Sequence, residues 1–381
     1  MTPRQAALLV LSQFFPALPG ELRRTTIEQY HTGGDQEAEI TSALLHDRPL
    51  PGLEGREAGQ AVQARLASGA LRQAAEEAAR RAELVGARLL FLGDDDYPAE
   101  LAKTQEAPPV LYVRGNARVL TGAAELISMV GTRRPTPLGV AFAARLARET
   151  VERGGIIVSG LALGIDAAVH EAALAADGVT VAVLASGVDS LTPRSNAPLG
   201  RRMLEQGAII SEMPPGTEAR PRIFPFRNRI IAGIASRVAV FEAGRSSGST
   251  ITGEYGVRYG RKVFALPGRP GDPATAGGLD LLADGAKPLT GTAALLAGGS
   301  AALADDPFAG LDVDLRQLVN TLSSELPCTV DELPLRLGLT EPQQVSRLLG
   351  GINVLTVMGL VQEDLFGRLQ FTALPPEPAV R

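Results

Sequence analysis

The sequence has few of the residues that build metal clusters and covalent cross-links. Its 381 residues include one cysteine, Cys328, three histidines and no tryptophan. A single cysteine excludes an intramolecular disulfide and a metal cluster held by several thiolates. The histidines, His31, His46 and His170, show no spacing typical of metal ligands. We therefore expect no metal site and no bound cofactor.

Long hydrophobic runs are also missing. No segment approaches the roughly 18 apolar residues of a membrane span, and the apolar stretch before Gln13 is short and lacks a preceding basic region. We expect a helix of a folded domain at the N-terminus in place of a signal peptide, no membrane span, and a cytoplasmic protein. Hydrophobic residues make up 45% of the chain, enough to bury a real core.

The first part of the chain predicts a small helical domain, residues 1–85. Pro19-Gly20 and Gly33-Gly34 divide residues 1–50 into three short segments with helical spacing of apolar residues. The Ala-rich, charged segment from Glu57 to Arg88 predicts one or two further helices, which we expect to be exposed.

The middle part, residues 86–295, alternates apolar runs with glycine and helical segments. The expected strands are Arg88–Leu92, Val110–Val113, Leu126–Val130, Ile156–Val158, Val179–Leu184, Ala208–Ile210, Val238–Phe241 and Val263–Leu266. Runs that are apolar throughout, with helices between them, are typical of a parallel sheet covered on both faces. Thr136 as N-cap and Pro137 at the first position predict one helix start. The fold class is therefore α/β, with a doubly wound, Rossmann-like parallel sheet.

The last part predicts a linker over residues 296–310 and a small domain over residues 311–381. Thr329 with Glu332, and Thr340 with Gln343, have the spacing of capping boxes that each open a short helix. The segment MGLVQEDLFGRLQF, residues 358–371, resembles a β-hairpin. Helix, helix-turn-helix and hairpin follow one another in the order of a winged helix.

Ligands of open α/β sheets bind beyond the carboxyl ends of the strands. Four glycine-rich segments are expected there: residues 131–134, 159–166, 187–189 and 244–250. Their backbone N–H groups and the helix N-termini that follow favour anions. Packing alone explains any single one of these loops equally well. GLALGID lacks the Lys-Ser/Thr of a phosphate-binding Walker loop, and no G-x-G-x-x-G follows the first strand of the parallel sheet, so neither nucleotide motif is present.

Charge is unevenly distributed along the chain. The net charge is -5, yet residues 110–290 hold 21 basic and 15 acidic side chains, while residues 305–381 hold 5 basic and 11 acidic ones. Four arginines, Arg220, Arg222, Arg227 and Arg229, lie beside Phe224 and Phe226 with no acid between Glu218 and Glu242. Arginines mixed with aromatic residues are typical of a surface that binds single-stranded nucleic acid. In the same stretch we expect a helix that begins near Ile230.

Other candidate chemistry is weaker. Asp166 and His170 are four residues apart on one expected helix, and we interpret them as a structural pair that orients the Gly160 loop in preference to a catalytic one. Glu212 and Glu242 follow strands and are the candidate acids of an alternative function, a nucleotide-binding or nucleotide-cleaving enzyme or sensor. A third hypothesis, a transcription regulator, conflicts with the acidic winged helix.

Many motifs in a fixed order resemble the DNA-processing protein A family (DprA, also called Smf). They include SMVGTRRPT, IVSGLALGIDAAVH, SGVDSLTPRSN, FPFRNRIIAG and FEAGRSSGSTIT, and the resemblance covers about residues 94–290. It implies a single-stranded DNA-binding protein without enzymatic activity, which protects incoming DNA in natural transformation and recombination and loads the RecA recombinase. It also implies a homodimer formed through the Rossmann-like domain, and an N-terminal domain of the SAM-like type.

The resemblance further implies which residues line the DNA site. They are Gly131, Arg133, Ser159, Gly160, Arg194, Arg222, Arg227, Asn228, Arg229, Ser247, Gly248 and Ser249. No catalytic residue is implied. One departure affects this set: family members commonly carry Tyr-Pro where this chain has Thr192-Pro193, so a ring next to Arg194 is lost.

Overall fold

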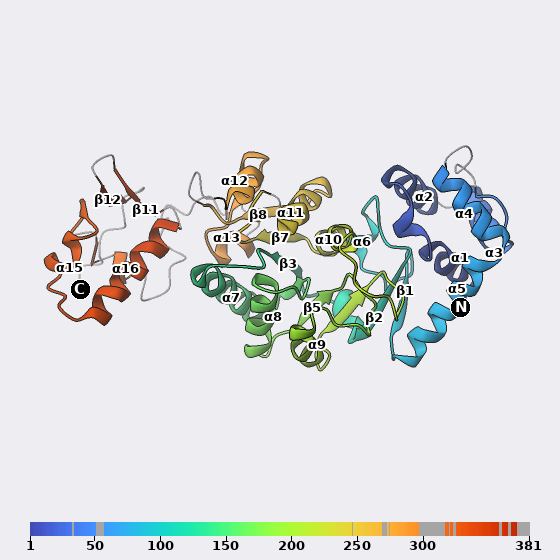
Figure 1. Ribbon diagram of the computed structural model, residues 1–381, viewed down its shortest axis with the longest axis horizontal. Coiled ribbons are helices and arrows are strands. Elements are labelled where there is room, and N and C mark those ends of the chain that lie inside the picture. The colour runs from blue at the N-terminus through green and yellow to red at the C-terminus, as the bar shows by residue number, and fades with distance from the viewer. Residues whose placement is uncertain are drawn as a thin grey trace. The chain divides into compact units, whose positions relative to one another are not determined.

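The computed structural model describes residues 1–32, 34–50, 57–245, 247–268, 273, 275–296, 317–319, 321–322, 325–357, 360–364 and 367–371 (Figure 1). The chain forms two compact units, Met1–Phe241 with Ser247–Val263, and Glu242–Ser246 with Phe264–Arg381. Apart from Leu296, the predicted linker, residues 296–310, lies outside the described residues. No helix among the described residues is long and apolar enough to span a bilayer.

Helices make up the beginning of the first unit, as the sequence predicts. They are α1 (Pro3–Ser12), η1 (Phe15–Ala17), α2 (Gly20–Thr32), α3 (Gly34–Leu45), α4 (Glu57–Ala67) and α5 (Ala70–Leu84). Thr2 and Gln5 form a reciprocal capping box at the start of α1. Leu8, Leu11 and Leu44 are fully buried among these helices.

The first unit then forms most of a mainly parallel sheet. Its strands are β1 (Arg88–Phe91), β2 (Val110–Gly115), β3 (Leu126–Val130), β4 (Ile156–Ser159), β5 (Thr180–Val183), β6 (Ala208–Ser211) and β7 (Arg237–Val240), in the order β1-β2-β6-β5-β4-β3-β7. The strands from β6 to β7 in this order pair in parallel, whereas β1 pairs with β2 and β2 with β6 in antiparallel fashion. The predicted parallel sheet is confirmed, with two antiparallel strands added at one edge.

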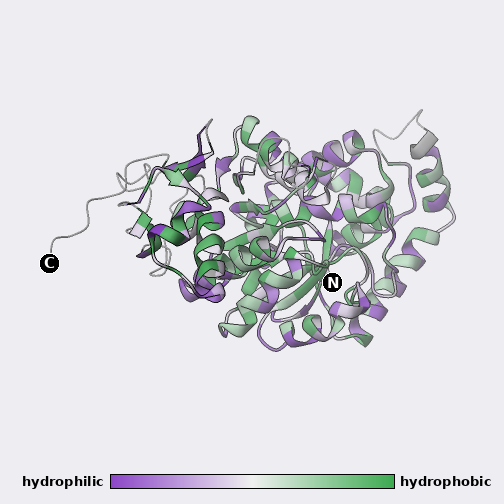
Figure 2. Ribbon diagram, turned by 60° about the vertical axis from the view of Figure 1, so that its left-hand side comes forward, coloured by the Kyte–Doolittle hydropathy of each residue, from purple (hydrophilic) through white to green (hydrophobic). Residues whose placement is uncertain are grey.

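Helices cover both faces of this sheet (Figure 1). One group contains α7 (Pro137–Glu152), α8 (Ile165–Ala175) and α9 (Ala197–Met203), and the other contains α6 (Ala99–Ala102), α10 (Ile223–Ile234) and α11 (Gly248–Arg258). The short helices η2 (Ala117–Leu120) and η3 (Arg194–Asn196) lie in loops. Thr136 Oγ1 accepts from Gly139 N, which confirms the predicted start of α7. Figure 2 shows hydrophobic residues concentrated on the strands and on the helix faces towards them, as expected for strands buried on both faces.

The stretch PRIFPFRNRIIAG folds differently from the prediction. Helix α10 begins at Ile223, well before Ile230, so that Phe224, Arg227 and Arg229 are helical. Pro225 lies in the first turn of α10. The backbone N–H of a residue in the first turn has no partner within the helix, so proline is tolerated there.

Strand β8 (Lys262–Ala265) begins in the first unit, where Lys262 N donates to Ser236 O. The second unit contains the remaining elements. They are α12 (Ala276–Ala283), β9 (Lys287–Pro288), which pairs with β8 in parallel, α13 (Thr292–Leu296), β10 (Cys328–Thr329), α15 (Glu332–Arg336), α16 (Pro342–Val357), β11 (Val361–Glu363) and β12 (Arg368–Phe371).

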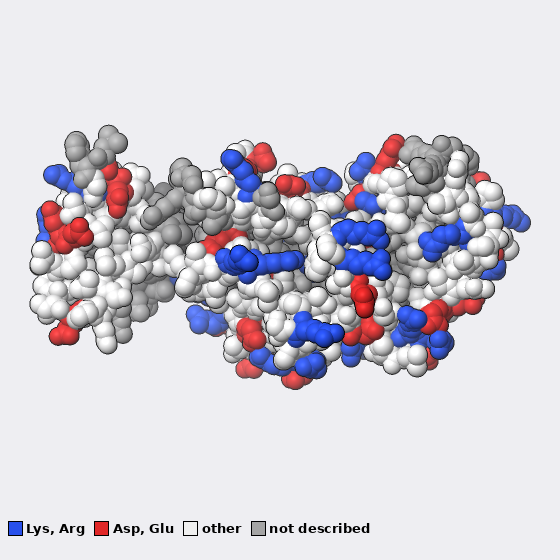
Figure 3. Space-filling view, in the orientation of Figure 1, with Lys and Arg blue, Asp and Glu red and all other residues white. Residues whose placement is uncertain are grey.

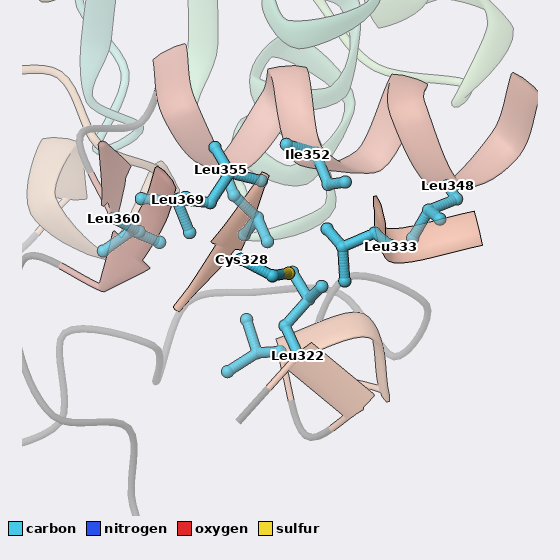
Figure 4. Packing of buried hydrophobic residues seen from close by; sticks show 10 residues of the cluster. Leu322, Cys328, Leu333, Leu348, Ile352, Leu355, Leu360 and Leu369 are labelled. Carbon is cyan, nitrogen blue, oxygen red and sulfur yellow. The ribbon is translucent and has the colours of Figure 1, made fainter. Parts of the chain in front are cut away.

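The C-terminal segment has its own sheet and core. Strands β10, β12 and β11 form an antiparallel sheet, which confirms the predicted hairpin. Leu322, Cys328, Leu333, Ile352 and Leu355 point towards one another in the core (Figure 4). Two details differ from the prediction. Thr329 lies in β10 and α15 starts only at Glu332, although Glu332 Oε2 accepts from Thr329 N at 3.3 Å, one of the two hydrogen bonds of the predicted capping box. Helix α16 is long, with 16 residues.

Gly207 lies directly before β6, and replacing it tests how closely the chain packs at the start of this strand. A Cβ atom at this position would overlap the carbonyl oxygen of Thr180 and lie 3.0 Å from Met203 O. We expect Gly207→Ala to lower the free energy of unfolding by at least ~2 kcal/mol, because backbone atoms must shift. Gly122→Ala is the control, since its nearest atom, Arg118 O, would lie 3.4 Å away. Urea unfolding measures both variants, and equal stabilities would contradict the described packing.

Candidate functional site

The glycine-rich loops meet at the carboxyl edge of the sheet, defined here as the edge where β3, β4 and β5 end. Ile165 N donates to Thr132 O across 3.2 Å, which joins the loop after β4 to the loop after β3. Gly164 has a φ of +81°, and a Cβ atom there would lie 2.9 Å from Arg133 Cα. The close approach of the two loops therefore requires glycine at this position.

Hydrogen bonds fix the Gly160 loop, residues 160–164, from two sides. Asp166 Oδ2 accepts from Gly160 N at 3.1 Å and from Ala162 N at 3.4 Å. Asn196 Nδ2 donates to Leu161 O at 3.0 Å and to Ala162 O at 3.1 Å. The predicted role of Asp166 in orienting this loop is confirmed, and Asn196 brings the Arg194 segment against the same loop.

The predicted pairing of Asp166 with His170 is wrong. His170 is fully buried, and its Nδ1 lies 2.6 Å from Thr180 Oγ1. Because that hydroxyl donates to Ile157 O, it accepts the proton of His170 Nδ1. Burial, followed by the charge of Arg227, lowers the pKa of His170 to about 3. Spacing along one helix indicated a possible contact but could not reveal a stronger partner on the neighbouring strand.

Arg227 is buried beneath the Gly160 loop, with only 4% of its surface exposed. Its Nη1 donates to Gly160 O at 3.0 Å and to Val183 O at the end of β5, and its Nε donates to Asn228 Oδ1. Burial lowers the pKa of Arg227 to about 10, an effect that nearby Asp166 opposes, so the guanidinium stays charged at neutral pH. Arg227 thus connects α10 to two strand ends.

Arg229 is buried more deeply, with 1% of its surface exposed. Its Nη1 and Nη2 donate to Glu212 Oε1 and Oε2 at 2.9 and 2.7 Å, a bidentate ion pair. Burial raises the pKa of Glu212, and the charge of Arg229 acts against this rise. Glu212, one of the two acids that the sequence suggests for an enzymatic function, is therefore held in a buried ion pair with Arg229.

Phe226 connects this ion pair to the N-terminal helices. The guanidinium carbon of Arg229 lies 3.8 Å from the centre of the Phe226 ring, and that of Arg23 on α2 lies 4.5 Å from it. Arg23 also pairs with buried Glu106 at 3.4 Å. The ring is therefore in contact with two cations, which couples α2 to α10.

The start of α11 lies against α10. Asn228 Nδ2 donates to Gly248 O at 2.8 Å, and Ser247 Oγ caps the helix by accepting from Ser249 N. Gly248 is exposed and Ser247 is half-buried, whereas Ser249 is buried. Asn228 neither caps its own helix nor reaches the surface, since only 8% of it is exposed.

The exposed part of this edge carries arginines that no carboxylate pairs with among the described residues: Arg133, Arg134, Arg194, Arg220 and Arg222. Some exposed arginines elsewhere pair with carboxylates, as Arg148 does with Glu152 and Arg202 with Glu171, whereas Arg118 and Arg201 have no such partner among the described residues. Arg133 lies 5.2 Å from the centre of the Phe224 ring, which brings the loop after β3 to the start of α10. Figure 3 shows basic side chains in two groups, one over the region that Figure 1 labels β3 and one beside α10, each with acidic side chains next to it.

The twelve predicted site residues thus differ in their exposure to solvent. Arg133, Arg194, Arg222 and Gly248 are exposed, and Ser247 and Gly131 are half-buried; Ser159, Gly160, Arg227, Asn228, Arg229 and Ser249 are buried. Ser159 Oγ donates inward to Met129 O. Among the described residues, no cluster of His, Cys, Asp and Glu is placed to hold a metal ion.

Comparisons with known proteins agree on one family. The model of the DNA recombination-mediator protein A family matches residues 88–298. The DNA processing protein DprA of Bacillus subtilis is 38% identical over 53% of this chain and 68% of its own length. A putative DNA processing protein DprA of Mycobacterium tuberculosis is 36% identical over 73% of this chain and 75% of its own length. The solved structure of DNA processing protein A from Streptococcus pneumoniae matches with a TM-score of 0.61 and 29% identity, covering 78% of this chain and 98% of that one.

The buried ion pair generates one prediction. Arg229→Met leaves Glu212 without its partner, and we expect it to lower the free energy of unfolding by about 3–5 kcal/mol. The double variant Arg229→Met with Glu212→Leu removes both charges and should recover most of that loss. Urea unfolding tests the pair, and a double variant as unstable as the single one would show that the ion pair is not the source of the loss.

A second prediction concerns pH. His170 binds its proton near pH 6.5 in the unfolded chain and only near pH 3 in the folded one. Between these values the unfolded state binds more protons, so stability falls as the pH is lowered, by up to ~1.4 kcal/mol per pH unit. From pH 7 to pH 5 we expect the wild type to lose ~2 kcal/mol more than His170→Asn does. Replacement of exposed His46 by glutamine is the control and should retain the wild-type slope.

Proposed function

Because the chain belongs to the DNA recombination-mediator protein A family, we propose that it binds single-stranded DNA along the carboxyl edge of its parallel sheet. The observation that carries the proposal is the group of exposed arginines at this edge that lack carboxylate partners. Free guanidinium groups are suited to phosphates, which they contact in a bidentate manner. The loops that carry them are held by hydrogen bonds, so little ordering is needed on binding.

The proposal divides the predicted site residues by role. Arg133, Arg194 and Arg222 contact phosphates, and Ser247 with Gly248 presents the N-terminus of α11 to the same strand. The buried residues Arg227, Asn228 and Arg229, together with Ser159 and Gly160, hold the loops in place. Because the contacts fall on phosphates, binding depends strongly on salt and little on base sequence.

The proposal extends to the rest of the chain. Residues 1–85 act as a SAM-like domain, residues 86–295 as the Rossmann-like DNA-binding domain, and residues 311–381 as a winged helix. The chain forms a homodimer through the Rossmann-like domain, protects incoming single strands and loads the RecA recombinase in natural transformation and recombination, in the cytoplasm and without catalysis. A nucleotide-cleaving activity is less well supported, because one of its two candidate acids, Glu212, is held by Arg229.

Phosphate contacts can be tested by charge removal. We expect Arg133→Ala and Arg222→Ala each to weaken binding of the full chain to oligothymidylate about tenfold at low salt, and to reduce the slope of log affinity against log salt by ~0.7. Fluorescence anisotropy over a series of salt concentrations measures both quantities.

Arg148→Ala is the matched control, because exposed Arg148 lies on α7 and pairs with Glu152 at 3.9 Å. It should leave affinity and slope as in the wild type. Unchanged slopes for Arg133→Ala and Arg222→Ala would rule out the carboxyl edge as the DNA site.

A further inference from the structure

An exposed leucine lies within the arginine-rich edge. Leu163, in the Gly160 loop, has 47% of its surface exposed, and among the described residues only Met1, Leu84, Val257 and Leu335 are other large hydrophobic residues with comparable exposure. A single exposed leucine is common on protein surfaces and indicates nothing by itself. The residues around Leu163 indicate a specific role for it.

The backbone on both sides of Leu163 is fixed. Leu161 has a φ of +57° and is fully buried, and its carbonyl, like that of Ala162, accepts from Asn196. Ala162 N donates to Asp166, and Gly164 packs against the backbone of Arg133. A non-glycine residue with positive φ persists only when its surroundings hold it. The loop therefore holds the Leu163 side chain in solvent at a defined position, where it gains no contact with the hydrophobic core.

The neighbours of this loop carry positive charge and a ring. Arg133, whose backbone contacts Gly164, lies over the half-buried Phe224 ring, and Asn196, two residues after exposed Arg194, donates to the loop. A single-strand site has two parts: cations that follow the phosphate backbone, and apolar surfaces beside them. The apolar surfaces are needed because unpaired bases expose flat apolar faces. A duplex keeps these faces stacked inside the helix.

We propose that Leu163 is an apolar platform for an unpaired nucleobase and gives the site its preference for single strands. The inference rests on the proposed function, since it assumes that phosphates lie on the neighbouring arginines. It adds a contact to the base in a site that otherwise binds phosphates, and it names a residue that determines specificity.

The test compares two strands with the same phosphates. Oligothymidylate and an abasic oligonucleotide of equal length are titrated into the full chain, and the ratio of the two affinities is measured by fluorescence anisotropy. We expect Leu163→Ala to reduce the preference for oligothymidylate about fivefold while leaving abasic binding unchanged. Leu163→Phe should raise the preference, because a ring stacks on a base over a larger area. A merely structural role of Leu163 would not produce that gain.

Leu84→Ala is the control, because Leu84 on α5 is also exposed, at 73%, and should not affect the ratio. An unchanged ratio in Leu163→Ala, with wild-type binding intact, would overturn the inference and leave the proposed function standing. Wild type that binds neither strand would overturn the proposed function and the inference together. A loss of oligomer mass in light scattering with an unchanged ratio would assign Leu163 to a contact between copies of the chain, again overturning the inference.

Discussion

Two buried guanidinium groups on one turn of α10 determine how the carboxyl edge is built. A charge removed from water is tolerated only where acceptors replace the lost hydration. Arg229 finds them in both carboxylate oxygens of Glu212, and Arg227 in the carbonyls of Gly160 and Val183. These partners belong to the ends of β4, β5 and β6. Burial of the two arginines therefore fixes the positions of three strand ends relative to α10.

The same turn extends this constraint to the N-terminal helices. Phe226 directly precedes Arg227 in sequence, and its ring contacts the guanidinium groups of Arg229 and of Arg23 on α2. A change in the position of α2 would alter the surroundings of the ion pair beneath the edge. The helical part of the first unit is thus coupled through a short chain of contacts to the loops that carry the exposed arginines.

Much of this architecture could be predicted from the sequence, and the failures have a common physical cause. Strands of a covered parallel sheet are apolar throughout, and Thr136 with Pro137 marks a helix start by local chemistry alone, so both were predictable. Whether an arginine is buried is not determined by the sequence around it. Arg229 is buried because of Glu212, 17 residues earlier, and Arg227 because of Gly160, 67 residues earlier. Nothing in PRIFPFRNRIIAG distinguishes these arginines from exposed Arg222.

The burial of acidic side chains also explains how a chain with a negative net charge has exposed arginines along this edge. Asp166 and Glu212 lie next to the loops of this edge, and left on its surface they would neutralise the nearby arginines. Both are buried instead, Asp166 on the amides of the Gly160 loop and Glu212 on Arg229. Their charges are balanced below the surface, where Arg227 and Arg229 lie. These two carboxylates therefore do not pair with the exposed arginines, although Asp189 and Glu218 in loops of the same edge remain exposed. The field of the exposed arginines extends into solvent. Arg229 thus contributes to the charge of this edge indirectly, by holding Glu212 below the surface.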